Sequence, residues 1–187
     1  MIFDDVISRD EANIIENWFL YHGFPWYYND VTVSPNSKFD TVAFDHPQFV
    51  HLFVKTENGI VTQNSEMTEY PLRLFRKFLS YMDLKEATLL RCKANLQMSV
   101  PNEERKYNIP HRDLDEEHYV LLYYVNDSDG DTFLFDNKFN ITHTISPKKG
   151  RFVLFNGETY HAGRHPIESH TRILLNYDFK LPPGEKI

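Results

Sequence analysis

Two histidines and one aspartate have the types and spacing of ligands for a single metal ion. One residue separates His111 from Asp113, and alternate side chains of an extended segment point to the same face. His161 lies far downstream, after an apolar run and an Asn-Gly turn. Strands that are distant in the sequence can be neighbours in a β-sandwich, so His161 can complete the set. Two imidazoles and one carboxylate on one side of a metal leave positions open for substrate and oxygen, an arrangement that suits non-haem Fe(II).

A basic residue follows this set at the start of an apolar run. Arg172 opens the sequence Arg-Ile-Leu-Leu-Asn-Tyr-Asp-Phe, and a guanidinium that points into a protein interior needs an anion beside it. Its fork of N–H groups matches a carboxylate through two parallel hydrogen bonds. A dicarboxylate held by a metal at one end would place its other carboxylate there. Arg164 is the alternative cation, but it falls in the turn after His161, where we expect it to be solvated.

The order of these residues resembles that of a known enzyme family. An HxD motif, a distal histidine and then a basic residue are the pattern of the Fe(II)/2-oxoglutarate dioxygenases. The run Leu121–Asn126, the segment Gly130–Thr132 and the segment Asn156–Gly163 are similar to the prolyl-4-hydroxylase-like branch. The resemblance covers about residues 89–180. The N-terminal half matches only loosely, through its helices.

The resemblance implies an oxidoreductase that uses Fe(II), 2-oxoglutarate and O₂. His111, Asp113 and His161 would bind the iron, and Arg172 would hold the distal carboxylate of 2-oxoglutarate. The implied reaction hydroxylates an unactivated C–H bond, for example of a prolyl or other peptidyl residue, and forms succinate and CO₂. The primary substrate stays open among a peptide, a protein and a small molecule, because a fold does not fix a function.

Three more residues match co-substrate contacts of the family. Tyr124 corresponds to a strand tyrosine that bonds the distal carboxylate in some relatives, and alternation places it on one face with Val120 and Leu122. Asn95 and Gln97 lie where relatives place a polar or tyrosine contact to 2-oxoglutarate. Many relatives also carry Ser or Thr two residues after the basic residue, but this chain has Leu174 there. Leu174 cannot make that hydrogen bond.

Two other classes of protein stay open. One is a cupin-like metal enzyme that uses the same ligands without 2-oxoglutarate, and it would have no use for Arg172 as a carboxylate clamp. The other is a non-catalytic β-sandwich binding module, which has no physical need for all four of these residues. The complete set therefore favours the oxygenase.

The elements that must position these residues change along the chain. From residue 87 onward, short alternating or β-branched runs are separated by turn residues, which is typical of an antiparallel sandwich or barrel. The expected strands are Leu89–Met98, Tyr119–Val125, Thr132–Phe135, Ile141–Ile145, Phe152–Phe155 and Arg172–Phe179. The fold class is therefore mainly β (α+β), with a jelly-roll core, the double-stranded β-helix of the family.

The N-terminal half supplies at least two packing helices. The first is expected over about Arg9–His22, because Ser8 and Glu11 form a capping-box pattern before an apolar stripe. The second is expected to begin near Pro71, a residue that suits the first helical turn. Short strands are expected near residues 41–44 and 51–55.

Length, charge and composition limit the number of domains, the partners and the cellular setting that we expect. The 187 residues predict a single domain over 1–187. The net charge of −7 argues against nucleic acid as a partner. Cys92 is the only cysteine, so no intrachain disulfide is possible and we expect a reducing, cytoplasmic setting. No run is long and apolar enough for a membrane span, and the N-terminus has no features of a secretory signal.

A polar stretch leads directly into the metal motif. Residues 101–107 are expected to form an exposed loop, and a mobile lid over the site, made of residues 101–109, is the functional alternative.

Overall fold

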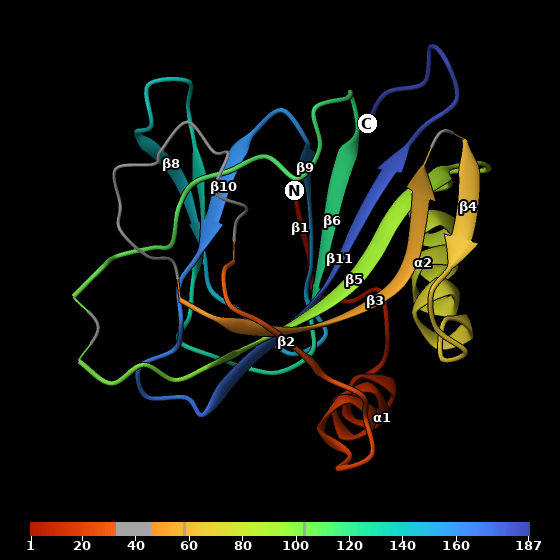
Figure 1. Ribbon diagram of the computed structural model, residues 1–187. Coiled ribbons are helices and arrows are strands. Elements are labelled where there is room, and N and C mark those ends of the chain that lie inside the picture. The colour runs from red at the N-terminus through yellow and green to blue at the C-terminus, as the bar shows by residue number, and fades with distance from the viewer. Residues whose placement is uncertain (33–45, 58, 103) are drawn as a thin grey trace.

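The computed structural model describes residues 1–32, 46–57, 59–102 and 104–187, which form two antiparallel sheets and two helices (Figure 1). The larger sheet has the order β1-β9-β6-β11-β5-β3-β2, with β4 paired to β3. Its strands are β1 (Ile2–Phe3), β2 (Tyr27–Asn29), β3 (Gln48–Glu57), β4 (Ile60–Gln63), β5 (Thr88–Met98), β6 (Tyr119–Tyr124), β9 (Phe152–Asn156) and β11 (Thr171–Lys180). The smaller sheet, β10-β7-β8, consists of β7 (Thr132–Phe135), β8 (Ile141–Ile145) and β10 (Tyr160–Gly163).

The two sheets face each other across a buried apolar layer. In Figure 1, β8 and β10 lie opposite the strands of the larger sheet. The layer contains side chains from both sheets: Val120, Leu122, Tyr124, Leu134, Ile145, Val153, Phe155 and Leu174. The alternation in β6 therefore points Tyr124 and its partners inward, and the predicted jelly-roll class is confirmed.

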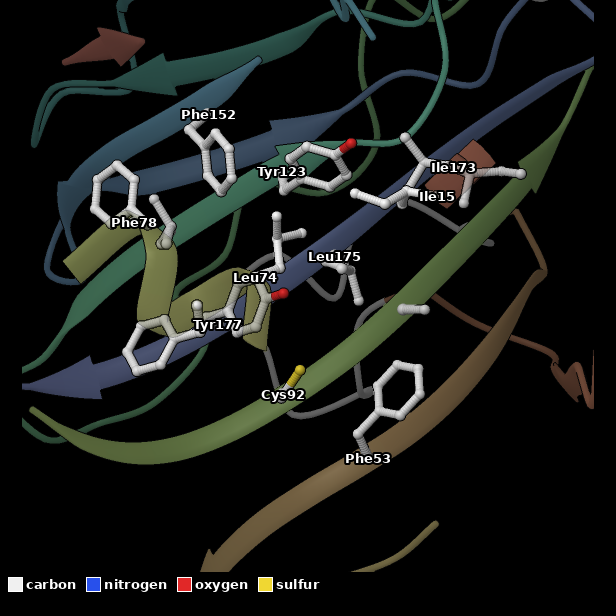
Figure 2. Close-up of a cluster of buried hydrophobic side chains, with 14 of the residues drawn as sticks. Ile15, Phe53, Leu74, Phe78, Cys92, Tyr123, Phe152, Ile173, Leu175 and Tyr177 are labelled. Carbon is white, nitrogen blue, oxygen red and sulfur yellow. The ribbon is translucent and has the colours of Figure 1, made fainter. Parts of the chain in front are cut away.

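Both helices cover the outer face of the larger sheet. α1 (Arg9–Leu20) begins at Ser8, whose hydroxyl accepts a hydrogen bond from the Glu11 amide at 3.2 Å, as the capping pattern predicted. α2 (Glu69–Tyr81) packs its apolar stripe on the sheet, and Figure 2 shows the rings of Phe78 and Phe152 side by side, with centroids 5.3 Å apart. A fully buried side chain of this size contributes roughly 1.5–3 kcal/mol, so the helices hold this face firmly.

The register between β5 and β11 arranges the polar side chains of the interior. Alternate residues of the two strands point into the space between the sheets, because the intervening ones pack under the helices. The inward cross-strand pairs are Arg172 with Gln97, Leu174 with Asn95, Asn176 with Lys93, and Asp178 with Arg91. These four pairs form a ladder along which the site is built.

Most expected elements are present. The six strands predicted from residue 87 onward are found to within one or two residues, and the expected strand near 51–55 is part of β3. The expected strand near 41–44 lies outside the described residues. β10, which carries His161, was not predicted as a strand. Among the described residues, neither helix is both long and apolar enough to cross a membrane.

Candidate active site

Strand pairing brings the three expected metal ligands together. His111 and His161 form an isolated antiparallel bridge, in which each backbone amide donates to the carbonyl of the other residue at 2.9 Å. The ligand atoms of His111, Asp113 and His161 all lie within 4.8 Å of one another. His161 Nε2 is 3.2 Å from Asp113 Oδ2. The three side chains therefore converge on one point, as a metal ion requires.

Backbone carbonyls fix which nitrogen each histidine presents. Nδ1 of His111 lies 3.0 Å from the Ile109 carbonyl oxygen, and Nδ1 of His161 lies 3.3 Å from that of Thr159. Because a carbonyl oxygen can only accept, we assign the proton to Nδ1 in both rings, which leaves Nε2 as the ligand atom. Burial and the neighbouring His161 lower the pKa of His111 to about 4. A neutral imidazole is the form that binds metals.

Two side chains hold the carboxylate of Asp113. Asn176 Nδ2 donates to Oδ2 at 3.0 Å, and the Arg91 guanidinium donates to Oδ1. Burial would raise the pKa of Asp113, but the charge of Arg91 and the contact with His161 outweigh it and hold the pKa well below its usual range. The carboxylate is therefore ionised and fixed in orientation.

A second buried acid lies behind Arg91. Arg91 Nε donates to Asp178 Oδ2 at 2.7 Å, and burial together with the charge of Asp113 raises the pKa of Asp178 to about 7. Asp178 Oδ1 faces His118 Nε2 at 3.8 Å, and neither atom has a hydrogen-bond partner in the described part of the chain. His118 Nδ1 donates to the Glu116 carbonyl at 2.6 Å. A proton on the Asp178 carboxyl relieves the repulsion between the two facing acceptors.

Arg172 lies at the other end of the ladder, buried among neutral acceptors. Its Nε donates to the Gly130 carbonyl at 2.6 Å, one Nη to Gln97 Oε1 at 2.9 Å and the other to Thr132 Oγ1 at 2.7 Å. Among the described residues, no carboxylate makes an ion pair with the guanidinium, and Asp131 acts on it only at longer range. A buried cation without an anion is costly, so this site is suited to receive one.

Two glycines leave room for this guanidinium. A Cβ at Gly163 would lie 3.2 Å from an Arg172 Nη, and one at Gly130 would lie 2.8 Å from Arg172 Cδ. The Tyr124 hydroxyl donates to Thr132 Oγ1 at 2.6 Å, and its ring centroid is 5.8 Å from the guanidinium carbon. Tyr124 therefore braces Thr132 and Arg172 from behind and does not line the pocket.

One pocket joins the three ligands to Arg172. The space within it is about 460 Å³, including the part that is open to solvent. It is lined by Thr32, Gln48, Lys93, Asn95, Gln97, His111, Asp113, Leu122, Thr132, His161, Gly163, Arg172, Leu174 and Asn176. Asn95 Oδ1 and Asn176 Oδ1 are buried there with no hydrogen-bond partner among the described residues. Two imidazoles, a carboxylate, an unmatched guanidinium and unfilled acceptors suit a divalent metal together with a dicarboxylate.

The pocket and the residues in contact with its lining include the expected site residues and four that sequence reasoning missed. His111, Asp113, His161 and Arg172 all line it, as do Asn95 and Gln97. The missed residues are Arg91, Lys93, Thr132 and Asn176. Alternation along β5 from Asn95, and along β11 from Arg172, was the signal that could have found three of them. Arg164 is half-buried rather than solvated, and it does not line the pocket.

The loop before the metal motif is anchored at its C-terminal end. Tyr107 packs on Phe133 and Phe135, with ring centroids 5.5 and 4.9 Å away, and the Asn108 amide donates to the Gly163 carbonyl at 2.9 Å. Tyr107 and Asn108, at the C-terminal end of the expected loop, are therefore fixed to β7 and β10.

Comparison with known proteins shows the fold. No family model and no curated protein sequence matches the chain. Solved structures do: an oxidoreductase of the 2OG-Fe(II) oxygenase family from Burkholderia pseudomallei has a TM-score of 0.72 at 14% identity, over 96% of this chain and 84% of that one. A prolyl hydroxylase from Trichoplax adhaerens, in complex with a hypoxia inducible factor peptide fragment, has 0.62 at 16%, over 96% and 82%. The α-ketoglutarate-dependent epimerase SnoN from nogalamycin biosynthesis has 0.65 at 11%, over 100% and 86%. The chain therefore has the fold of 2-oxoglutarate-dependent Fe(II) oxygenases.

Proposed function

We propose that this protein is an Fe(II)- and 2-oxoglutarate-dependent dioxygenase that hydroxylates an unactivated C–H bond. One observation carries the proposal: Arg172, a buried guanidinium with no carboxylate partner among the described residues, lies in the same pocket as the cluster His111, Asp113 and His161. A cupin-like metal enzyme would use the cluster but not this guanidinium.

The spacing along β11 suits a five-carbon dicarboxylate. Asn176 touches the metal ligand Asp113, and Arg172 lies four positions earlier on the same strand. At about 3.4 Å per residue the two positions are roughly 14 Å apart. The Arg172 guanidinium and the ligand cluster line the same pocket, which 2-oxoglutarate would bridge from the metal to the guanidinium.

The proposal gives a task to the ligand cluster and to the residues around the guanidinium. His111, Asp113 and His161 hold Fe(II), while Arg172 binds the distal carboxylate of 2-oxoglutarate. Gln97 and Thr132 keep the guanidinium in place. When bound, Fe(II) and 2-oxoglutarate would supply the oxidative chemistry, in which O₂ is consumed, succinate and CO₂ are formed, and a substrate C–H bond is hydroxylated.

The apolar wall of the pocket has a protective task. Leu174 lies between the two polar ends, and Leu122 lies opposite Asn176 at the metal end. Leu174 occupies the position where many relatives carry a hydroxyl. Apolar side chains there exclude water from the co-substrate and strengthen its contacts with charged groups. The affinity for 2-oxoglutarate would therefore depend on Arg172 to a large degree.

The primary substrate is proposed as a peptide or a small molecule. A prolyl or other peptidyl residue is the first candidate, because one structural neighbour is a prolyl hydroxylase in complex with a peptide. The epimerase among the neighbours keeps small molecules in consideration.

An anaerobic titration tests the cofactors. Metal-free protein receives Fe(II) and then 2-oxoglutarate, and the weak visible charge-transfer band of a chelated keto acid is recorded. We expect the band to appear, and Arg172→Met to raise the apparent dissociation constant for 2-oxoglutarate by about tenfold or more, because a charge-assisted double contact is lost. Arg164→Met, which removes the same charge outside the pocket, should change it little.

The other outcomes are equally informative. Iron binding without any band would overturn the 2-oxoglutarate assignment in favour of a cupin-like enzyme. If the protein binds no iron, and if Asp113→Asn does not change its affinity for any other metal, the protein would be a non-catalytic binding module. An equal loss of 2-oxoglutarate affinity in both arginine variants would refute the role of Arg172.

A further inference from the structure

Lys93 is a cation in the pocket that the proposed function does not use. It lies on β5 opposite Asn176, the residue that holds the metal ligand Asp113. Its side chain lines the pocket, so the ammonium lies at the metal end, two cross-strand pairs away from Arg172. Among the described residues, no acceptor lies within hydrogen-bond or ion-pair distance of it, and Asp113 and Asp178 act on it only from further away.

The charges of the loaded site leave Lys93 unmatched. The two positive charges of Fe(II) would be balanced by Asp113 and by the chelating carboxylate of 2-oxoglutarate. The distal carboxylate would balance Arg172, and Asp178 already pairs with Arg91. Lys93 remains, and a half-buried cation in this pocket is stabilised when an anion reaches it.

We propose that Lys93 binds an anionic group, a carboxylate in the first instance, of the primary substrate. This inference rests on the proposed function and narrows it, because the substrate would carry its negative charge close to the carbon that is oxidised. The unpaired Oδ1 of Asn176 lies across from Lys93 and can accept an N–H of the same molecule. A small amino-acid-like or acyl-amino-acid-like carboxylate has both groups, whereas an uncharged peptide segment has only the second.

The same ammonium could instead contact the chelating carboxylate of 2-oxoglutarate, so the experiment separates the two sources. The anaerobic protein is saturated with Fe(II) and 2-oxoglutarate, and acetate is titrated as a minimal carboxylate probe, with acetamide as its uncharged counterpart. Binding is followed by the shift of the charge-transfer band and by calorimetry. The 2-oxoglutarate dissociation constant is measured separately for each variant.

The variants isolate the charge. Lys93→Met removes the ammonium while keeping a long side chain, and Lys93→Arg keeps a cation. Lys138→Met, in the exposed turn between β7 and β8, makes the same change in net charge away from the pocket. We expect saturable binding of acetate but not of acetamide in the wild type, Lys93→Arg and Lys138→Met. In Lys93→Met, the acetate affinity should fall by about tenfold or more, with unchanged affinity for 2-oxoglutarate.

Each contrary result has a distinct meaning. A tenfold or larger loss of 2-oxoglutarate affinity in Lys93→Met would overturn the inference and assign the lysine to the co-substrate. Acetate binding that survives in Lys93→Met, or that is absent from the wild type, would refute it as well. Absence of the charge-transfer band in the wild type would instead refute the proposed function itself.

Discussion

At the scale of single residues, Arg91 connects the metal ligand to the protein interior. It donates to Asp113 on one side and to the fully buried Asp178 on the other. One guanidinium therefore compensates two carboxylates, one of which would also bind the metal. Contacts of this kind orient a ligand and commonly change metal affinity by 10–100-fold when they are lost.

Arg91→Met should damage stability and metal binding together. Removing one partner of a buried ion pair typically costs about 3–5 kcal/mol, because the remaining charge is left without compensation. We expect that loss of unfolding free energy in urea at about pH 8, where the wild-type Asp178 is ionised, its pKa being raised to about 7 by burial and by Asp113.

The double variant Arg91→Met/Asp178→Asn separates the two effects. It removes the uncompensated charge, so a large part of the stability should return, but Asp113 still lacks its donor and Fe(II) affinity should stay reduced. If the single variant unfolds at the wild-type urea concentration, the ion pair is not a stabilising contact.

At the scale of elements, the sequence predicts the strands that have a clear local residue pattern. It does not predict a strand that forms only because it pairs with another strand. β5 alternates apolar and polar residues, and β6 and β11 are mostly apolar runs bounded by turns, so the extent of all three strands could be predicted. β10 is Tyr-His-Ala-Gly, with no β-branched residue, and only its pairing with β7 makes it a strand. The metal ligands were found because a motif carries them.

The residues around those ligands were missed for a physical reason. Arg91 and Lys93 look like ordinary polar residues of an alternating strand. Their role depends on the register of β5 against β11, which places them opposite Asp178 and Asn176. Register is set by long-range packing, and no single segment encodes it.

The turn before β10 requires glycine at position 157, and this requirement also comes from packing against a residue that is distant in the sequence. A Cβ at this residue would lie 2.3 Å from the His118 ring, which is fully buried beside Asp178. Gly157→Ala should therefore destabilise the protein by about 1–3 kcal/mol, the usual cost of overpacking. Since the turn leads to His161, Fe(II) affinity should fall as well.

A double-mutant cycle measures whether the clash is the cause. Combining Gly157→Ala with His118→Ala makes space for the added methyl group, so the combined loss of unfolding free energy should be smaller than the sum of the single losses. Additive losses would show that Gly157 is required for its backbone and not for the histidine.

At the scale of the whole molecule, a buried neutral histidine anchors the segment between β10 and β11 to the interior. His165 is 2% exposed, and its Nδ1 donates to the Met98 carbonyl at 3.0 Å, which ties this segment to the end of β5. Burial lowers the pKa of His165 to about 4 although the hydrogen bond to Met98 acts the other way, and the nearby His46, Arg172 and Arg105 act in the same direction as burial. The folded state therefore resists protonation at this position.

This resistance predicts how stability changes with pH. In the unfolded chain His165 takes up a proton below about pH 6.5, whereas in the folded protein it does so only near pH 4. The unfolded state thus binds more protons between these values, and stability is lost as the pH falls from about 6.5 to about 4. A shift of this size corresponds to about 3 kcal/mol at most.

His165→Gln should remove this contribution, because glutamine can still donate to the Met98 carbonyl but does not titrate. Urea unfolding of metal-free protein is compared between about pH 7 and pH 5, which excludes effects of bound iron on His111. The variant should lose less stability than the wild type over this range, while His143→Gln, at an exposed position of β8, should behave as the wild type does.

Protonation of carboxylates also destabilises the fold in acid, but all three proteins have the same carboxylates, so this effect cancels when their stabilities are compared. Parallel pH profiles of His165→Gln and the wild type would mean that the histidine is protonated in the fold and that the closing segment tolerates a charge.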